Sequence, residues 1–489
     1  MSIPSYISRA ADGLLGLVCL VAVAVGCSST QYADEADEVV ETPDDGEQNA
    51  TIDGLGARAW CSDFGHAGLD ETVQRAWSDN MQLKAAWARL RQAEAVARIE
   101  SASLWPTAEA GAEVDVSNRE FGGFNGAQGT GDGGTQTEAS WELSATAAYE
   151  VDLWGRHRSR ARAAALEADA VEADARSLAI TLTSEVAEAW FDVIAQRERV
   201  ELLEAQLEAS RDIAEITRIR ARRGLVGALD VAQQDRNVES IQGDLAAAKG
   251  LERTSRHRLA VLVGQAPGDH AREDQLVGDQ TLPDVEPLEA SEVPADLLQR
   301  RPDVRSAYLF LEAADERTAA AVADRLPRLR LTASLGFQAE QIASLFEQLF
   351  WSVGAGIAQP IFEGGRLRAE VERSEAVAQE QLFFYADALL VAMREVRDAL
   401  ALESTGSERI ESLERELDIA QSVLELAQKR YRTGTVDYLR VLTGLQALQQ
   451  VERTLLEARR QQISHRIELC RALGGSWVDS VQPSITSDD

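Results

Sequence analysis

Polar and apolar residues alternate with a period of two in four segments of the chain. These segments are residues 107–117, 139–153, 329–338 and 349–361. Each has about ten residues or more and one largely apolar face, which is typical of strands in a transmembrane β-barrel. A half-buried sheet in a soluble domain shows the same alternation and stays open as the alternative. Strand length and the aromatic residues on the apolar faces favour the barrel.

Most of the remaining chain has the helical period instead. Amphipathic helices are predicted from Leu69 to Leu104 and from Pro294 to Leu326, since each pattern stops beside a proline. Proline is absent from 155–223 and from 366–432, and a helix of that length is roughly 100 Å long. Apolar residues recur at seven-residue spacing in the first of these, at Val186, Val193, Val200, Leu207 and Ala214. Sustained heptads imply coiled-coil packing, so long helical hairpins are expected.

The two kinds of segment occur twice in the same order, which indicates an internal two-fold repeat. Matching residues lie 210 positions apart, including Gly224 with Gly434 and Gly264 with Gly474. Gly224 and Gly434 follow the longest predicted helices and are placed at tight reversals. The predicted boundaries are 1–26 for a signal peptide, 27–59 for an acidic tether, 60–264 for the first repeat, 265–293 for a non-helical connection, 294–477 for the second repeat and 478–489 for a C-terminal tail.

The N-terminus has the pattern of a processed segment. An apolar run from Leu14 to Val25 is too short to span a bilayer but fits the central region of a signal peptide. Small residues followed by Cys27 resemble the lipidation box of bacterial lipoproteins, so Cys27 is the predicted lipid attachment site. An ordinary signal peptide with an incidental cysteine is the alternative. No later stretch is apolar over about 18 residues, so membrane-spanning helices are not expected.

Composition narrows the classes of function. The 489 residues include 49 Lys and Arg against 81 Asp and Glu, a formal net charge of -32, whereas nucleic-acid binding requires a basic surface. The 5 His and 4 Cys residues are scattered, so no metal site is expected. The sequence contains no catalytic or cofactor-binding signature. We therefore expect a protein that is not an enzyme and that has no cofactor, metal or nucleic-acid partner.

Four strands are too few to close a barrel, because open edges in lipid leave backbone groups unpaired. Several chains must therefore pool their strands, and the helical hairpins must stack as a tube. The predicted fold is mainly α-helical with a membrane β-barrel part, and the predicted assembly is a hollow conduit. A lipid-anchored periplasmic coiled-coil scaffold without a pore is the alternative, although such a scaffold does not need the four alternating strands.

Several short motifs, taken in their order along the chain, resemble a known family. They are residues 151–156, 300–305, 359–366, 430–434 and 471–477. The chain resembles the outer membrane factor family, the TolC-like channels, and in particular its lipoprotein subfamily paired with resistance-nodulation-division pumps. The resemblance implies a homotrimer with a twelve-stranded barrel in the outer membrane of a Gram-negative bacterium and an α-helical tunnel in the periplasm. It also implies passive export of small molecules, with a type I protein-secretion outlet as the alternative.

The same resemblance implies partners and a place for them. The partners would be a periplasmic adaptor, an inner-membrane pump and outer-membrane lipid. The two turns around Gly224 and Gly434 would form the periplasmic tips that face the adaptor. The tip residues carried over in this way are Arg223, Gly224, Arg432, Thr433 and Gly434.

One departure from the family pattern lies beside the second tip. The family often carries Asp six residues after the tip glycine, whereas this chain has Arg440, with Asp437 nearby. In the first repeat the corresponding residue is Asp230. We hypothesise that Asp230 and Arg440 form an ion-pair layer that gates the pore, because close pairs in a narrow throat are stronger than surface pairs. The alternative is that both side chains point into solvent.

Two cysteines besides Cys27 remain after the signal peptide is removed, in a compartment that oxidises thiols. Cys61 precedes the first helix and Cys470 ends the last one. In the family both regions lie near the middle of the tunnel, so the resemblance allows a disulfide between them. The alternative is that Cys470 is an ordinary core residue of its heptad series.

Overall fold

The computed structural model describes residues 32, 64, 66–120, 135–286 and 300–474. The predicted signal peptide, Cys27, Cys61 and the C-terminal tail lie outside the described residues. The chain divides into two compact units. The first unit includes residues 94–120, 135–167 and 310–382, and the second includes residues 66–93, 168–286, 300–309 and 383–474.

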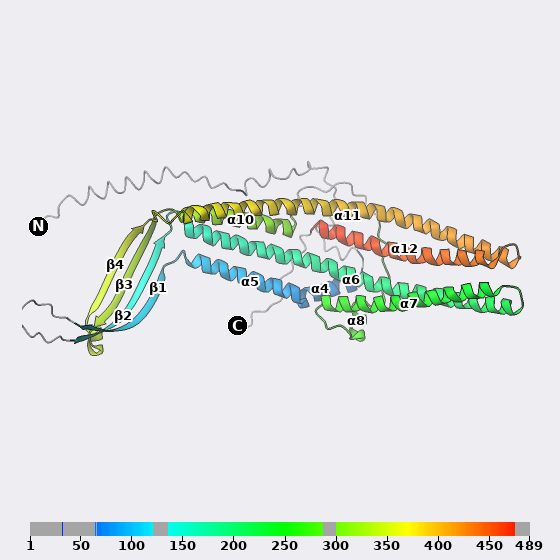
Figure 1. The fold of residues 1–489 in the computed structure, drawn as a ribbon, viewed down its shortest axis with the longest axis horizontal. Coiled ribbons are helices and arrows are strands. Elements are labelled where there is room, and N and C mark those ends of the chain that lie inside the picture. Colours follow the sequence, from blue (N-terminus) through cyan, green and yellow to red (C-terminus); the bar gives the residue numbers. More distant parts are fainter. Residues whose placement is uncertain (1–31, 33–63, 65, 121–134, 287–299, 475–489) are drawn as a thin grey trace, which may run out of the picture. The chain divides into compact units, whose positions relative to one another are not determined.

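The first unit contains one antiparallel sheet with the strand order β1-β2-β3-β4 (Figure 1). Its strands are β1 (Thr107–Glu120), β2 (Thr135–Val151), β3 (Arg328–Ala339) and β4 (Leu349–Ala358). A short 3-10 helix, η2 (Ile342–Glu347), lies between β3 and β4. The four predicted strands are confirmed, and their ends differ from the predicted ones by only a few residues.

The register of the sheet sets apolar residues beside apolar residues on one face. One row contains Trp351, Leu335, Ala145 and Ala110, and the next contains Val353, Ala333, Ala147 and Ala108. Side chains alternate between faces along a strand, so a register slip of one residue would move every one of them to the opposite face. The apolar positions predicted separately for each strand therefore form one continuous surface.

The helices of both units follow the predicted pattern. They are α4 (Ala67–Asp79), α5 (Met81–Ala102), α6 (Arg156–Arg222), α7 (Ala228–Leu262), α8 (His270–Val277), α10 (Pro302–Ala323), α11 (Arg366–Arg432) and α12 (Tyr438–Ala472). The two proline-free segments are indeed single helices, α6 and α11, of 67 residues each. Helix α10 begins at Pro302. Backbone N–H groups in the first turn of a helix have no partner within the helix, so the N–H that proline lacks is not missed there.

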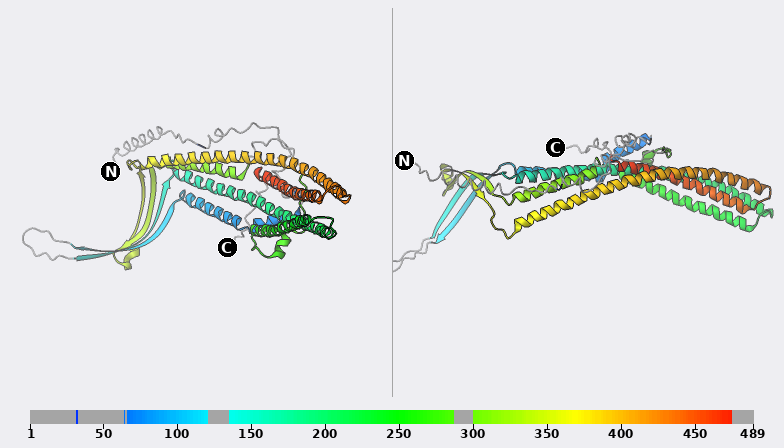
Figure 2. Two further views of the ribbon diagram at one scale, coloured as in Figure 1. Left: turned by 45° about the vertical axis from the view of Figure 1, so that its right-hand side comes forward. Right: turned by 90° about the horizontal axis from the view of Figure 1, so that it is seen from above.

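In the second unit, the end of α6 and α7 form one hairpin, and the end of α11 and α12 form another. The views in Figures 1 and 2 show these hairpins side by side. The Gln206 amide on α6 donates a hydrogen bond of 3.2 Å to the main-chain oxygen of Gln449 on α12. Apolar residues of α11 and α12, including Leu424 and Leu445, also pack against Ile213 of α6. The hairpins are thus held together by both polar and apolar contacts.

The first predicted helix, from Leu69 to Leu104, is interrupted at Asn80. The Asn80 backbone is extended, and its side-chain oxygen accepts hydrogen bonds from the backbone N–H groups of Gln82 (2.9 Å) and Leu83 (3.0 Å). An Asn side chain that satisfies these donors starts a new helix in place of continuing the old one. The helical period of the sequence continues across Asn80, so it did not predict the break between α4 and α5.

The connection 265–293 was predicted to be non-helical, and this prediction is wrong for the eight residues of α8. The Glu273 carboxylate in the first turn of α8 accepts a 2.7 Å hydrogen bond from the backbone N–H of Gly268. At the end of the helix, Leu276 and Val277 are buried in the main core of the second unit. Burial of these two side chains stabilises a helix too short to be stable alone.

The core of the second unit is centred on two fully buried aromatic residues of α6, Trp190 and Phe191. Their rings pack edge to face with centroids 5.0 Å apart, and Phe64 lies 5.1 Å from Phe191. The Trp190 indole N–H donates to the main-chain oxygen of Leu276, so its polar edge is satisfied inside the core. The long helix α6 is therefore fixed by α4 and α8 at this level.

We expect Gly264→Ala to destabilise this core by more than about 2 kcal/mol. Gly264 has a φ of 73°, and a Cβ atom there would lie 2.4 Å from the main-chain oxygen of Asp79. Both the backbone conformation and the contact therefore exclude a side chain. The control is Gly243→Ala in α7, where an added Cβ atom would meet no other atom within 4 Å and alanine is the better helix former. Thermal unfolding of the purified protein measures both, and equal unfolding temperatures would contradict the prediction.

Candidate functional site

The apolar face of the sheet is exposed within the chain. Trp351 is 72% exposed and Val353 is 75% exposed, and Leu335 and Ile357 on the same face are also exposed. A continuous exposed apolar surface of this kind marks contact with a membrane or a partner. Among the helices of the described part of the chain, none has both the length and the apolar character needed to cross a membrane.

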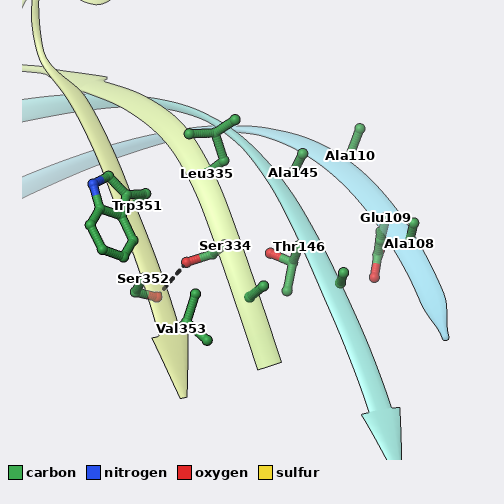
Figure 3. Close-up of a pocket in the computed structure, with 12 residues that line it drawn as sticks. Ala108, Glu109, Ala110, Ala145, Thr146, Ser334, Leu335, Trp351, Ser352 and Val353 are labelled. Carbon is green, nitrogen blue, oxygen red and sulfur yellow. Dashed lines mark hydrogen bonds between the residues drawn. The ribbon is translucent and has the colours of Figure 1, made fainter. Parts of the chain in front are cut away.

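The opposite face of the sheet is polar. Figure 3 shows the hydroxyl groups of Ser334 and Ser352 hydrogen-bonded at 2.7 Å across β3 and β4. Thr146 on β2 and Glu109 on β1 continue this row, and a shallow hollow lies in this part of the sheet (Figure 3). A sheet with one apolar and one polar face is the arrangement of a barrel that borders lipid outside and water inside.

Neither edge of the sheet has a neighbouring strand among the described residues, because β1 and β4 end the strand order. β1 and β4 run in opposite directions, since the three pairings between consecutive strands are all antiparallel. In lipid, unpaired edges leave N–H and C=O groups without partners, so a sheet in a membrane needs further strands at such edges.

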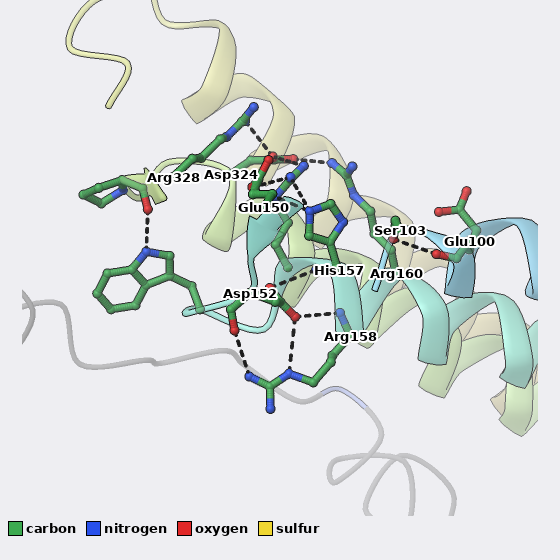
Figure 4. Close-up of polar contacts among 12 residues, drawn as sticks. Glu100, Ser103, Glu150, Asp152, His157, Arg158, Arg160, Asp324 and Arg328 are labelled. Atoms are coloured by element: carbon green, nitrogen blue, oxygen red, sulfur yellow. Dashed lines mark hydrogen bonds and ion pairs between the residues drawn. The ribbon is translucent and has the colours of Figure 1, made fainter. Parts of the chain in front are cut away.

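A cluster of charges fastens the sheet to the helices of the first unit (Figure 4). The Arg156 guanidinium donates to Glu150 at 2.6 Å, and Asp324 on the other repeat accepts from Arg160 at 2.6 Å. Asp152 accepts hydrogen bonds from the backbone N–H groups of His157 and Arg158 and so caps the first turn of α6. This accounts for the polar residues of the motif 151–156.

The two tips have the same backbone geometry. Gly224 and Gly434 have φ values of 69° and 73°. The N–H of the residue after each glycine bonds to the carbonyl five residues earlier, in Leu225 to Arg220 and in Thr435 to Arg430. This is the Schellman arrangement, which requires a residue that tolerates positive φ at the glycine position. The predicted reversals at both glycines are therefore present.

The carboxylates predicted for the gate lie at the starts of the returning helices. Asp230 accepts a 2.9 Å hydrogen bond from the backbone N–H of Gly227, and Asp437 accepts one of 3.3 Å from the backbone N–H of Arg440. Among the described residues of this chain, no ion pair joins Asp230 to Arg440. The hypothesised ion pair thus stays a prediction for contacts between chains.

A buried polar layer near the tips was not predicted from the sequence. The Tyr438 hydroxyl donates to Gln234 at 2.7 Å, and the Gln234 amide donates to the main-chain oxygen of Ser210 at 2.7 Å. The Gln449 amide donates to the Ser210 hydroxyl at 3.2 Å. The sequence signal for it is Gln449, a polar residue at seven-residue spacing with Leu442, Leu456, Ile463 and Cys470. Buried polar groups with partners favour one arrangement of the helices.

The sequence also did not single out the buried residue Arg301, although it belongs to the motif 300–305. It is 5% exposed, and its guanidinium donates to Asp303 at 2.7 Å and to Glu395 at 2.8 Å. It also donates to the main-chain oxygen of Ala472 at 3.0 Å. Burial raises the pKa of Asp303, but the hydrogen bonds and charge of Arg301 outweigh burial and hold that pKa below its ordinary value. Arg301 therefore joins α10, α11 and the end of α12.

The structure does not test the disulfide predicted between Cys61 and Cys470. Cys470 is buried in α12 within the main core of the second unit, and Cys61 lies outside the described residues. The disulfide that the resemblance allows stays a prediction, and intact mass after alkylation, with and without prior reduction, tests it. An unchanged mass would refute the disulfide.

Comparison with known proteins agrees with this geometry. The family model described as outer membrane efflux protein matches residues 72–265 and 293–475. The pyoverdine export outer membrane protein OpmQ of Pseudomonas aeruginosa is 32% identical over 423 residues, which cover 86% of this chain and 88% of OpmQ. The toluene efflux pump outer membrane protein TtgC of Pseudomonas putida is 30% identical over 425 residues, 86% of each chain.

Solved structures show the same fold. The outer-membrane channel OprN matches with a TM-score of 0.80 at 26% identity and covers 90% of this chain and 98% of its own. The outer membrane protein VceC of Vibrio cholerae matches with a TM-score of 0.75 at 25% identity over 85% of this chain. The fold class predicted from the sequence, mainly helical with a barrel-forming sheet, is confirmed. The chain belongs to the outer membrane efflux protein family and is an outer-membrane channel component of an efflux system.

Proposed function

We propose that three copies of this chain pool their strands into one twelve-stranded barrel, which continues into a helical tunnel and serves as a passive outlet. The observation that carries the proposal is the single apolar face across β1–β4, with an edge strand on each side that has no further partner among the described residues. β4 of one copy would pair with β1 of the next, and their opposite directions give the antiparallel pairing that membrane barrels use.

The number of strands supports three copies over two. Two copies would supply only eight strands, and the interior of an eight-stranded barrel is filled by its own side chains. Twelve strands leave room for a lumen lined by the polar row that contains Ser334, Ser352 and Thr146. The resemblance to TolC-like channels supports the same number.

We propose that the channel works with a periplasmic adaptor and an inner-membrane pump, of the resistance-nodulation-division type. The sequence contains no nucleotide-binding motif, so energy for export would come from the pump. Two relatives are named for export of pyoverdine and of toluene, which favours small organic molecules over a protein cargo. Lipidation of Cys27 would add an anchor in the same membrane.

The test is conductance of the full-length, detergent-extracted protein in a planar lipid bilayer, with gel mobility of unheated and heated samples beside it. Discrete current steps together with a heat-labile oligomer of trimer mass are expected. A well-folded monomer without conductance would overturn the channel assembly and favour the coiled-coil scaffold.

We further propose that Asp230 of one chain and Arg440 of its neighbour gate the pore. The two residues are 210 positions apart and occupy the third position of α7 and of α12, so they are equivalent in the repeat but opposite in charge. In the assembled tube, equivalent helix starts would alternate around the opening, so that each carboxylate faces a guanidinium.

Arg440→Ala is therefore expected to raise the open probability of single channels. Asp230→Ala should raise it to a similar extent, and the double variant should add little, because either substitution alone removes the pair. Single-channel recording measures all three. An open probability unchanged in Arg440→Ala, or additive effects in the double variant, would contradict the ion-pair gate.

A further inference from the structure

The two tips carry a charge opposite to that of the whole chain. We define the first tip as residues 218–230 and the second tip as residues 429–440. The first tip contains Arg218, Arg220, Arg222, Arg223 and Asp230, and the second contains Lys429, Arg430, Arg432, Arg440 and Asp437. Each tip thus has four cations and one carboxylate, in a chain with a net charge of -32.

Helix dipoles explain part of this charge. Cations in the last turn of a helix are stabilised by its negative end, and this applies to the basic residues at the ends of α6 and α11. It does not apply to Arg440. Arg440 lies in the first turn of α12, where the positive end of the helix disfavours a cation. The charge of Arg440 calls for another explanation.

Much of the positive charge at the tips has no partner in the described part of the chain. Arg218 pairs with Asp235 at 2.7 Å, Arg222 pairs with Glu215 at 3.6 Å, and Arg220 lies 4.6 Å from the centroid of the Tyr431 ring. The cations with neither an ion pair nor a ring contact among the described residues are Arg223, Lys429, Arg430, Arg432 and Arg440. All five are exposed. Their charges are therefore available to a partner.

Apolar side chains lie among these cations. Leu225 is 65% exposed, Leu229 is 69% exposed and Leu439 is 46% exposed. The contacts of Arg220 with Tyr431 and of Tyr438 with Gln234 connect the two hairpins at this end. The tips thus form one surface, which we call the tip surface, with both exposed leucines and unpaired cations. Apolar centres with polar rims are typical of protein interfaces.

We propose that the tip surface docks a protein whose contact region is acidic at its rim and apolar at its centre. This inference rests on the proposed function, in which the periplasmic adaptor meets the channel at its tips, and it names the chemistry of the adaptor surface. Exposed leucines favour a protein partner over a small anionic solute. A protein can bury them against its own apolar side chains, whereas a small anion has no apolar surface to cover them.

The difference between the basic tips and the acidic chain as a whole also orients an acidic partner. A chain with a net charge of -32 repels an acidic surface overall, whereas the two basic tips attract it. Complementary charge at a rim mainly accelerates association and excludes other orientations, and it is screened by salt. Binding at the tip surface should therefore weaken as ionic strength rises.

The experiment first identifies the contact and then measures its charge dependence. A photo-crosslinking amino acid at Leu225 of the full-length protein in its own bacterium captures the adaptor. The purified adaptor is then titrated against the detergent-extracted channel at about 50 mM and about 300 mM NaCl. The channel is compared with Arg223→Glu/Arg432→Glu and with Arg91→Glu, an exposed arginine of α5 outside the tips.

The higher salt concentration is expected to weaken adaptor binding by about tenfold or more, and the double variant should do the same at low salt. Arg91→Glu should leave the dissociation constant within about twofold. An affinity for the adaptor that changes neither with salt nor with the double substitution would overturn the proposal. A double variant that changes only the ion selectivity of the conducting channel would overturn it too, since the cations would then serve permeation.

Failure of the proposed function gives a different result. If the channel conducts but no adaptor is captured at Leu225, the partnership at the tips is wrong, and this inference falls with it. If the adaptor is captured and binds without regard to charge, only the acidic character of its surface is refuted.

Discussion

Val353→Arg is expected to prevent assembly of the channel in the membrane. Val353 lies in the middle of β4 on the apolar face, where it is 75% exposed within the chain and would face lipid in the barrel. An arginine on the lipid face of a membrane barrel costs about 2–4 kcal/mol near the bilayer midplane. An assembly of three chains would carry this cost three times. We expect the heat-labile oligomer and the conductance to be lost.

The adjacent residue provides a matched control. Ser352 precedes Val353 in β4 and belongs to the polar row with Ser334. Ser352→Arg introduces the same side chain on the face that would line the lumen, so assembly should persist while conductance and ion selectivity change. Gel mobility before and after heating, together with bilayer recording, measures both variants. Equal tolerance of arginine at the two positions would show that the apolar face does not border lipid.

Arg301→Met is expected to lower the free energy of unfolding by about 1–3 kcal/mol, because it removes the buried cation that serves two partly exposed carboxylates, Asp303 and Glu395. Glu395 keeps a contact of 3.3 Å with Arg471, but Asp303 loses the charge that holds its pKa low. The main-chain oxygen of Ala472 loses a donor as well. The second unit should therefore become less stable where α10, α11 and α12 meet.

The pH dependence separates this cause from a simple loss of packing. With the pKa of Asp303 held low, its pair with Arg301 stabilises the fold above the unfolded-state pKa near about 4 and is lost as pH falls through the folded-state pKa. Without Arg301, the partial burial of Asp303 remains and raises that pKa, so protonation removes the cost of a partly desolvated charge. The difference between variant and wild type should be largest near about pH 7 and shrink toward about pH 4.

Arg305→Met is the control, since Arg305 is exposed on the same helix and should change stability by less than about 0.5 kcal/mol. Thermal unfolding followed by far-UV circular dichroism across this pH range measures each protein. A destabilisation by Arg301→Met that stays constant with pH would show that Asp303 does not carry the effect.

The sequence alone predicted the strands, the two longest helices and the reversals at Gly224 and Gly434. These features follow from the side-chain period and from the one residue that adopts positive φ without strain, and both are local properties of the chain. The sequence also predicted the tips as a functional region, although only through resemblance to a family. It could not foresee the break at Asn80, because a side-chain cap leaves the helical period unchanged.

Tertiary structure decided the contacts between residues distant in sequence. Arg301 meets Glu395 and the end of α12 because helices within the second repeat pack together. Gln449 meets Ser210 because helices from the two repeats lie side by side. The same holds for α8, which is helical because its last residues are buried in a core centred on Trp190. The periodic pattern shows which face of an element is buried, whereas the partner on that face depends on how the whole chain packs.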